Sequence, residues 1–184
     1  MKFSRTEIID LVKAWIAISI AFGIVLRGEF GFIESFILSG LTVGIGFLLH
    51  ELAHKIVAQR YKCWAEFRSF DQMLLLAILM SFFGFVFAAP GAVFIRGNVT
   101  TSKNGKISVA GPITNIILAI LFYLLLQFSS GYLNIISLYG LRINALLALF
   151  NMIPVWNFDG AKVFPWNKTV YFTVVIIAFI LMLL

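Results

Sequence analysis

Long apolar runs constrain this chain more than any other feature of its sequence. A membrane-spanning helix needs about 20 predominantly apolar residues, and all of these runs except the last approach that length. Apolar residues make up 61% of the chain and charged residues 12%, whereas a soluble domain is about half apolar and a quarter charged. The sequence therefore predicts one all-α polytopic membrane domain over residues 1–184, with five to six transmembrane helices. The runs cover approximately residues 8–26, 32–58, 73–95, 111–127, 132–153 and 169–184.

A short stretch after the third run has the composition of strands and turns. A Pro-Gly pair at residues 90–91 breaks a helix, and residues 93–99 are rich in β-branched and aromatic side chains. An Asn-Gly pair at residues 104–105 is a strong signal for a two-residue hairpin turn. We therefore expect a small membrane-associated β element over about residues 91–109, followed by a helix that has Pro112 in its first turn.

The basic residues predict how the helices cross the membrane. Cytoplasmic loops of membrane proteins carry an excess of Lys and Arg, which accounts for the net charge of +6 without a nucleic-acid partner. If the third run doubles back instead of crossing, nearly all basic clusters fall on one side and only Arg27 clearly opposes them. We therefore expect the third run to be re-entrant or to lie on the surface. The clusters are Lys2, Arg5 and Lys13; Arg60, Lys62 and Arg68; Arg96, Lys103 and Lys106; and Lys162 and Lys168.

The only two histidines of the chain, His50 and His54, lie in the second apolar run, with Glu51 beside the first. This His-Glu-x-x-His spacing puts both imidazoles on one face of a helix, where both can reach one metal ion. Glu51 points to a neighbouring angle, from which it can take a proton from a water molecule that the metal activates. Polar groups in hydrocarbon are costly and usually functional, so we favour a metal site over two histidines that merely bridge helices.

A third protein ligand is expected, because a catalytic zinc site has three protein ligands and one open position. Asp159 is the best candidate, since it follows a helix that is predicted to end at Pro154, and Gly160 lets the backbone approach closely. If the third run is not a full crossing, Asp159 returns to the same side of the membrane as the histidines. The other aspartates are Asp10 and Asp71.

Three segments carry a resemblance to a known family: HELAH at residues 50–54, AGPITN at 110–115 and NMIPVWNFDG at 151–160. Together they resemble the site-2 protease family of intramembrane zinc metalloproteases, peptidase family M50, in a compact form without a PDZ domain. The order and spacing match over about residues 35–165, which leaves the helices at 8–26 and 169–184 as flanks. The chain departs from the family at Ala161, where many members have a second glycine.

The resemblance implies that one zinc ion per chain is bound by His50, His54 and Asp159, with Glu51 as the general base. It also implies that Asn151 holds the substrate carbonyl or its developing oxyanion, a role that suits an amide donor. The alternative for Asn151 is a helix-ending amide that is hydrogen-bonded to the carbonyl groups ahead of Pro154.

By this resemblance, the expected function is that of an intramembrane endopeptidase that cleaves transmembrane or signal-peptide-like segments of membrane proteins. We expect a multi-pass protein in the lipid bilayer of the cell membrane, with its active site toward the cytoplasm. Residues 91–99 would bind the unwound substrate as an edge strand. Two alternatives remain: a non-catalytic zinc-binding relative that binds a membrane partner, and a small metal transporter, which polar groups gathered near one side disfavour.

Other polar and small residues within the apolar runs have structural interpretations. Asn144 lies seven residues before Asn151 and is expected to hydrogen-bond a neighbouring helix. Gly40 and Gly44 have the spacing of a close helix contact. Lys55 is expected to extend toward the membrane interface.

Overall fold

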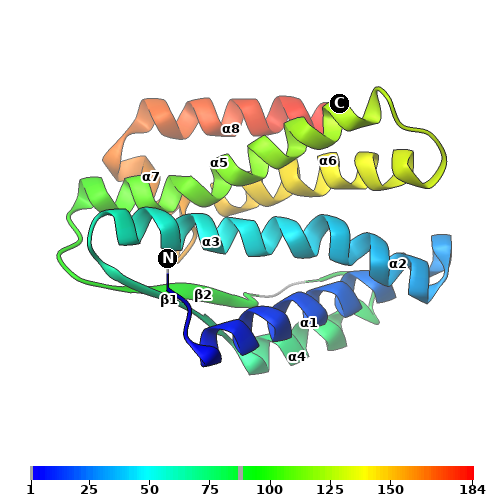
Figure 1. Ribbon diagram of the computed structural model, residues 1–184. Coiled ribbons are helices and arrows are strands. Elements are labelled where there is room, and N and C mark those ends of the chain that lie inside the picture. Colours follow the sequence, from blue (N-terminus) through cyan, green and yellow to red (C-terminus); the bar gives the residue numbers. More distant parts are fainter. Residues whose placement is uncertain (1, 87–88) are drawn as a thin grey trace.

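The computed structural model describes residues 2–86 and 89–184, and most of them are helical. Figure 1 shows α3 running through the middle of the molecule, with α5 to α8 on one side of it and the sheet, α1 and α4 on the other. The elements are α1 (Arg5–Phe30), α2 (Phe32–Ser39), a π-helical turn (Gly40–Gly44), α3 (Ile45–Arg60), β1 (Trp64–Ser69), α4 (Asp71–Ser81), β2 (Gly91–Arg96), α5 (Thr101–Leu126), α6 (Gly131–Asn151), α7 (Gly160–Trp166) and α8 (Lys168–Leu183).

Four helices in the described part of the chain are long and apolar enough to cross a membrane: α1, the continuous helix Phe32–Arg60, α5 and α6. The other two apolar helices are shorter, at 11 residues for α4 and 16 for α8. A helix of 11 residues is about 16 Å long, roughly half the thickness of the hydrocarbon core. The helical part of the third apolar run is therefore too short to cross a bilayer. That run includes residues 87–88, which lie outside the described residues.

The helix that carries the histidines widens into a π-helical turn at Gly40–Gly44. The indole Nε1 of Trp15 in α1 donates to the carbonyl oxygen of Gly40 at 3.0 Å. A Cβ on Gly44 would lie 2.7 Å from the same Nε1. The close helix contact expected at Gly40 and Gly44 is therefore confirmed, because a side chain at Gly44 would displace the indole.

The β element differs from its expected extent of about residues 91–109. β2 pairs antiparallel with β1, from Trp64 opposite Arg96 to Ser69 opposite Gly91, and β1 was not expected. The prediction is wrong beyond Arg96, since the expected hairpin turn lies inside α5. The hydroxyl of Thr100 accepts a hydrogen bond from the backbone N–H of Lys103 at 3.3 Å and so caps α5 at its start.

Tertiary packing explains why the Asn-Gly signal fails in α5. A Cβ on Gly105 would lie 2.5 Å from the side chain of Trp166 in α7, so the glycine serves a close helix contact rather than a turn. Pro112 consequently lies well inside α5 and not in its first turn, which is a second correction.

The two larger apolar cores among the described residues lie on opposite sides of α3, and a smaller one forms around Ala58, Ala65 and Ile107. One larger core is shared by α5, α6, α7 and α8, and includes Leu141 and Val163, both fully buried. The other joins α1, α3, α4 and β1 around Phe67, which is also fully buried. The polar residues of the sequence motif lie on α3 between these cores.

Candidate metal centre

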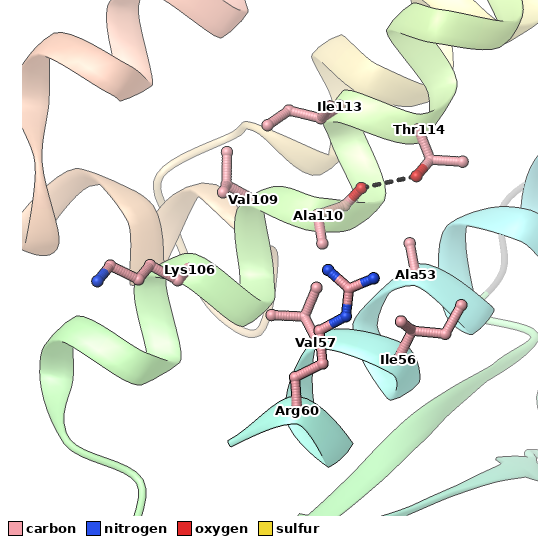
Figure 2. Close-up of a pocket in the computed structure, with 9 residues that line it drawn as sticks. All are labelled: Ala53, Ile56, Val57, Arg60, Lys106, Val109, Ala110, Ile113 and Thr114. Atoms are coloured by element: carbon pink, nitrogen blue, oxygen red, sulfur yellow. Dashed lines mark hydrogen bonds between the residues drawn. The ribbon is translucent and has the colours of Figure 1, made fainter. Parts of the chain in front are cut away.

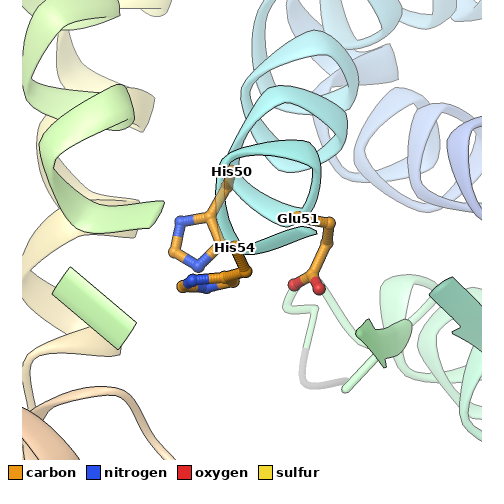
Figure 3. Close-up of side chains that lie close together, drawn as sticks. All are labelled: His50, Glu51 and His54. Carbon is orange, nitrogen blue, oxygen red and sulfur yellow. The ribbon is translucent and has the colours of Figure 1, made fainter. Parts of the chain in front are cut away.

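His50 and His54 lie on the face of α3 that is directed toward α5. Their ring centroids are 4.6 Å apart, and the residues are only 4% and 8% exposed. Figure 3 shows the two imidazoles side by side, with Glu51 directed away from them. The helical spacing predicted from the sequence therefore places both rings on one face of a single helix turn.

Asp159 reaches the two histidines from the start of α7. Its Oδ2 lies 3.2 Å from Nε2 of His50 and 3.2 Å from Nε2 of His54. Asp159 occupies the N-cap position of α7, but its carboxylate makes no capping bond, so it is free to face the imidazoles. A Cβ on Gly160 would lie 2.1 Å from the carbonyl oxygen of Met152. Glycine at this position therefore lets α7 start directly against the end of α6.

Hydrogen bonds at the far nitrogens orient both rings. Nδ1 of His50 lies 2.6 Å from Oδ1 of Asn115, and Nδ1 of His54 lies 2.8 Å from the carbonyl oxygen of Ile107. The amide of Asn115 is itself fixed, since its Nδ2 donates to the carbonyl oxygen of Gly46 and to Oδ1 of Asn144. Both Nδ1 atoms therefore donate to these oxygens, and Nε2 of each ring faces Asp159.

This donor set fits zinc. Two nitrogen lone pairs and a carboxylate oxygen repel one another unless a proton or a cation lies between them. Two ligand atoms that each lie about 2.0–2.1 Å from a tetrahedral zinc ion are about 3.3 Å apart, close to the 3.2 Å that separates Oδ2 from each Nε2. Protein acceptors on both Nδ1 atoms are also typical of zinc-binding histidines.

Glu51 is buried beside this set but has a different partner. Its Oε2 accepts a hydrogen bond from the backbone N–H of Val93 in β2 at 3.1 Å. One carboxylate oxygen of Glu51 lies within 4.8 Å of a ring nitrogen of each histidine, so distance alone would also admit Glu51 as a ligand. The shorter contacts of Asp159 to both Nε2 atoms favour Asp159 as the ligand and leave Glu51 available as a base.

Asn115 and Gly111 were not predicted to belong to the site, although both lie in the AGPITN segment. A Cβ on Gly111 would lie 2.4 Å from Nε2 of His50 and 2.6 Å from Cε1 of His54. The sequence does contain a signal for Asn115, because a polar side chain inside an apolar helix is costly and often functional. The expectation for Asn144 is confirmed, because it accepts its hydrogen bond from Asn115 on a neighbouring helix.

Asn151 ends α6 and is half-buried. Its Nδ2 donates to the carbonyl oxygen of Leu147 at 2.9 Å, one turn earlier in the same helix. This is the arrangement of a helix-ending amide. An oxyanion-binding role would require the amide to exchange this hydrogen bond for one to substrate.

A groove of about 350 Å³ lies between α3 and α5 (Figure 2). Its walls are mainly apolar and include the basic residues Arg60 and Lys106. The histidines, Glu51 and Asp159 are not among the residues that line it. The lining residues are Ala53, Ile56, Val57, Arg60, Lys106, Val109, Ala110, Ile113 and Thr114.

Comparison with known proteins finds three similar chains. The first is "Putative zinc metalloprotease MJ0611" of Methanocaldococcus jannaschii, 43% identical over 174 residues that cover 92% of this chain and 89% of the relative. "Putative zinc metalloprotease YwhC" of Bacillus subtilis is 30% identical over 67% of this chain and 65% of its own length. "Zinc metalloprotease MJ0392" of M. jannaschii is 29% identical over 65% of this chain and 31% of its own length. No family model matches the chain, and no solved structure matches it significantly.

Substitution of Gly111 tests the close approach of α5 to the imidazoles. Gly111→Ala should lower zinc affinity by about 10- to 100-fold, as changes next to metal ligands typically do, because the new methyl group would overlap both rings. The matched control is Gly28→Ala in α1, where a Cβ would meet nothing within 4 Å. Zinc titration of the two purified variants measures the effect, and wild-type affinity in Gly111→Ala would contradict the packing described here.

Proposed function

Since the chain belongs to the zinc metalloproteases that these archaeal and bacterial relatives represent, we propose that it is an intramembrane endopeptidase of the site-2 type. It hydrolyses peptide bonds within or near transmembrane segments of membrane proteins. The proposal rests mainly on one observation: His50, His54 and Asp159 converge inside a bundle of helices that are apolar enough to cross a membrane. His50, His54 and Asp159 would hold the zinc ion.

The chemistry divides between the zinc and Glu51. Zinc held by His50, His54 and Asp159 would supply Lewis-acid chemistry toward a peptide carbonyl and an attacking water. The Glu51 carboxylate accepts a proton from the attacking water and later returns it to the leaving amine as a general acid. The hydrogen bond from Val93 holds one carboxylate oxygen of Glu51 and leaves the other for this exchange.

The substrate must be unwound before it can react, because the carbonyl groups of a helix are engaged in hydrogen bonds. β2 offers a surface for the unwound segment. Residues along an antiparallel strand alternate in the side to which their N–H and C=O groups point. The N–H of Val93 points away from β1 toward Glu51, so Gly91 and Ile95 present their backbone groups on the same open edge. An extended substrate would add to that edge.

Asn151 remains part of the proposal as the donor to the developing oxyanion. Its amide belongs to the last residue of α6 and donates to the carbonyl oxygen of Leu147, a hydrogen bond that it would exchange for one to the substrate. The substrates we propose are transmembrane or signal-peptide-like segments. The excess of Lys and Arg on one side supports a multi-pass arrangement in the cell membrane with the active site toward the cytoplasm.

Replacement of Glu51 separates catalysis from metal binding. Glu51→Gln keeps the volume and an oxygen that can accept from Val93, but it cannot take a proton. We expect cleavage of a model transmembrane peptide to fall by at least about 100-fold, with one zinc ion per chain retained. Wild-type cleavage in this variant would rule out the role of Glu51 and favour another reaction path.

Replacement of Ile95 tests the open edge of β2. Ile95→Pro removes one outward N–H group and leaves the hydrogen bonds to β1 in place, because Pro is tolerated where the N–H faces away from the ladder. We expect cleavage of the transmembrane peptide to fall by about 10-fold, the equivalent of one hydrogen bond, with unchanged zinc content. Ile95→Val is the matched control, since it keeps the N–H group and should cleave normally. Equal cleavage by the two variants would exclude strand addition at this position.

A further inference from the structure

Lys55, the residue after His54, is fully buried, so the prediction that it extends toward the membrane interface is wrong. Its Nζ lies 2.5 Å from Oε2 of Glu7 in α1 and 2.8 Å from the carbonyl oxygen of Lys2. It also lies 4.0 Å from the centre of the Phe3 ring. The cation is thus enclosed by the N-terminal segment and by α1, one residue away from a histidine of the metal centre.

The other carboxylate oxygen of Glu7 holds the sheet. Oε1 of Glu7 accepts a hydrogen bond from the backbone N–H of Phe67 in β1 at 3.0 Å. Glu7 is itself fully buried. Glu7 therefore joins three elements: it belongs to α1, and its carboxylate bonds Lys55 of α3 and Phe67 of β1.

Phe67 stands opposite Val93 in the sheet, and the N–H of Val93 donates to Glu51. Both N–H groups of this pair point outward, as in a non-hydrogen-bonded pair of an antiparallel ladder. One pair of residues is consequently held at both edges of the sheet by carboxylates, Glu7 on the β1 edge and Glu51 on the β2 edge.

Glu51 and Lys55 lie one turn apart on α3 and so share a face of that helix. The sheet is attached to this face at three points: directly through Glu51, through Lys55 by way of Glu7, and through Gln59, whose Nε2 donates to the carbonyl oxygen of Ala65 in β1 at 3.4 Å. These attachments fix the position of the strand pair along α3 as well as its distance from it. The Glu7 attachment lies on β1, whereas Glu51 bonds β2.

The ion pair is not explained by stability alone. A buried ion pair is often replaceable by apolar residues of similar volume without loss of stability, because desolvation of the two charges offsets their attraction. What an apolar residue at position 7 cannot supply is an acceptor for the N–H of Phe67. That difference singles out the carboxylate oxygen, rather than the charge, as the functional feature.

We propose that Glu7 is a positioning residue: its carboxylate oxygen holds the N–H of Phe67 in β1, so that the N–H of Val93 in the paired β2 meets the carboxylate of Glu51. Loss of the acceptor at position 7 loosens β1 at Phe67, and β2 with it because the two strands are paired, while the hydrogen bond from Gln59 to Ala65 remains. The catalytic consequence of this attachment rests on the proposed function, whereas the attachment itself does not.

Two double variants isolate the acceptor. Glu7→Gln with Lys55→Met removes both charges and keeps an oxygen that can accept from Phe67. Glu7→Met with Lys55→Met removes both charges and the acceptor together. The pair differs at position 7 only, and neither variant leaves a buried charge without a partner.

The first readout needs neither zinc nor substrate. NMR on the labelled, metal-free protein in micelles measures the rate of amide hydrogen exchange at Val93. In the Gln/Met variant this rate should be within about twofold of the wild-type rate. In the Met/Met variant it should be at least about 10-fold faster, as expected when one hydrogen-bonded anchor is lost. Equal exchange at Val93 in the two variants overturns the proposal.

The second readout is the kinetics of peptide cleavage. The Met/Met variant should lose at least about 10-fold in kcat with unchanged zinc content and little change in KM, whereas the Gln/Met variant should keep the wild-type kcat. A shared loss in both variants overturns the positioning role.

If wild type itself cleaves no peptide while exchange at Val93 still separates the variants, the proposed function fails and the attachment stands. If the Met/Met variant does not fold, the Gln/Met variant decides alone: faster exchange at Val93 in it overturns the proposal, and wild-type exchange supports it.

Discussion

The structure depends on how polar groups are accommodated inside an apolar helix bundle. Two imidazoles and two carboxylates are buried around α3, where each unpaired polar atom would cost several kcal/mol. The Nδ1 atoms bond Asn115 and Ile107, and Glu51 accepts from Val93, while the Nε2 atoms and Asp159 face one another across the position that a cation would take. These contacts come from α5, from the start of α7 and from β2. The need to satisfy a few atoms on one helix thus determines which other segments must meet there.

Small residues make this convergence possible. Gly111 brings α5 against the imidazoles, and Gly160 brings the start of α7 against the end of α6. A side chain at either position would separate a donor from its partner by displacing a whole helix. Asn115 of α5 then joins α3 through the carbonyl oxygen of Gly46 and α6 through Oδ1 of Asn144. Such hydrogen bonds are specific in a way that apolar contacts between transmembrane helices are not. The glycine contacts and the asparagine hydrogen bonds therefore act on the same helices. A substitution that moves one of these helices is expected to disturb both kinds of contact.

Much of this arrangement is readable from the sequence, and the reasons for the failures are physical. The apolar runs predict the helices, and the spacing of His50 and His54 predicts two rings on one face, since both depend on helix periodicity alone. The proximity of Asp159 follows from the basic residues, which limit the number of crossings. The extent of the β element was not predictable from local signals. Gly105 serves a contact with Trp166 and not a turn, and the partner strand β1 lies 27 residues before β2 in the chain (Trp64 to Gly91). Lys55 was misjudged because its partner, Glu7, is distant in sequence.

The proposed chemistry depends most on a single divalent ion held jointly by α3 and by the residue that precedes α7. X-ray absorption spectroscopy and metal analysis of the purified protein, set beside the same data for Asp159→Ala, test it most directly. We expect one zinc ion per chain with two imidazole nitrogens and a carboxylate oxygen in the wild type, and loss of most of the zinc in Asp159→Ala. Wild-type zinc content in Asp159→Ala, or a wild-type spectrum without two imidazole ligands, would contradict the account.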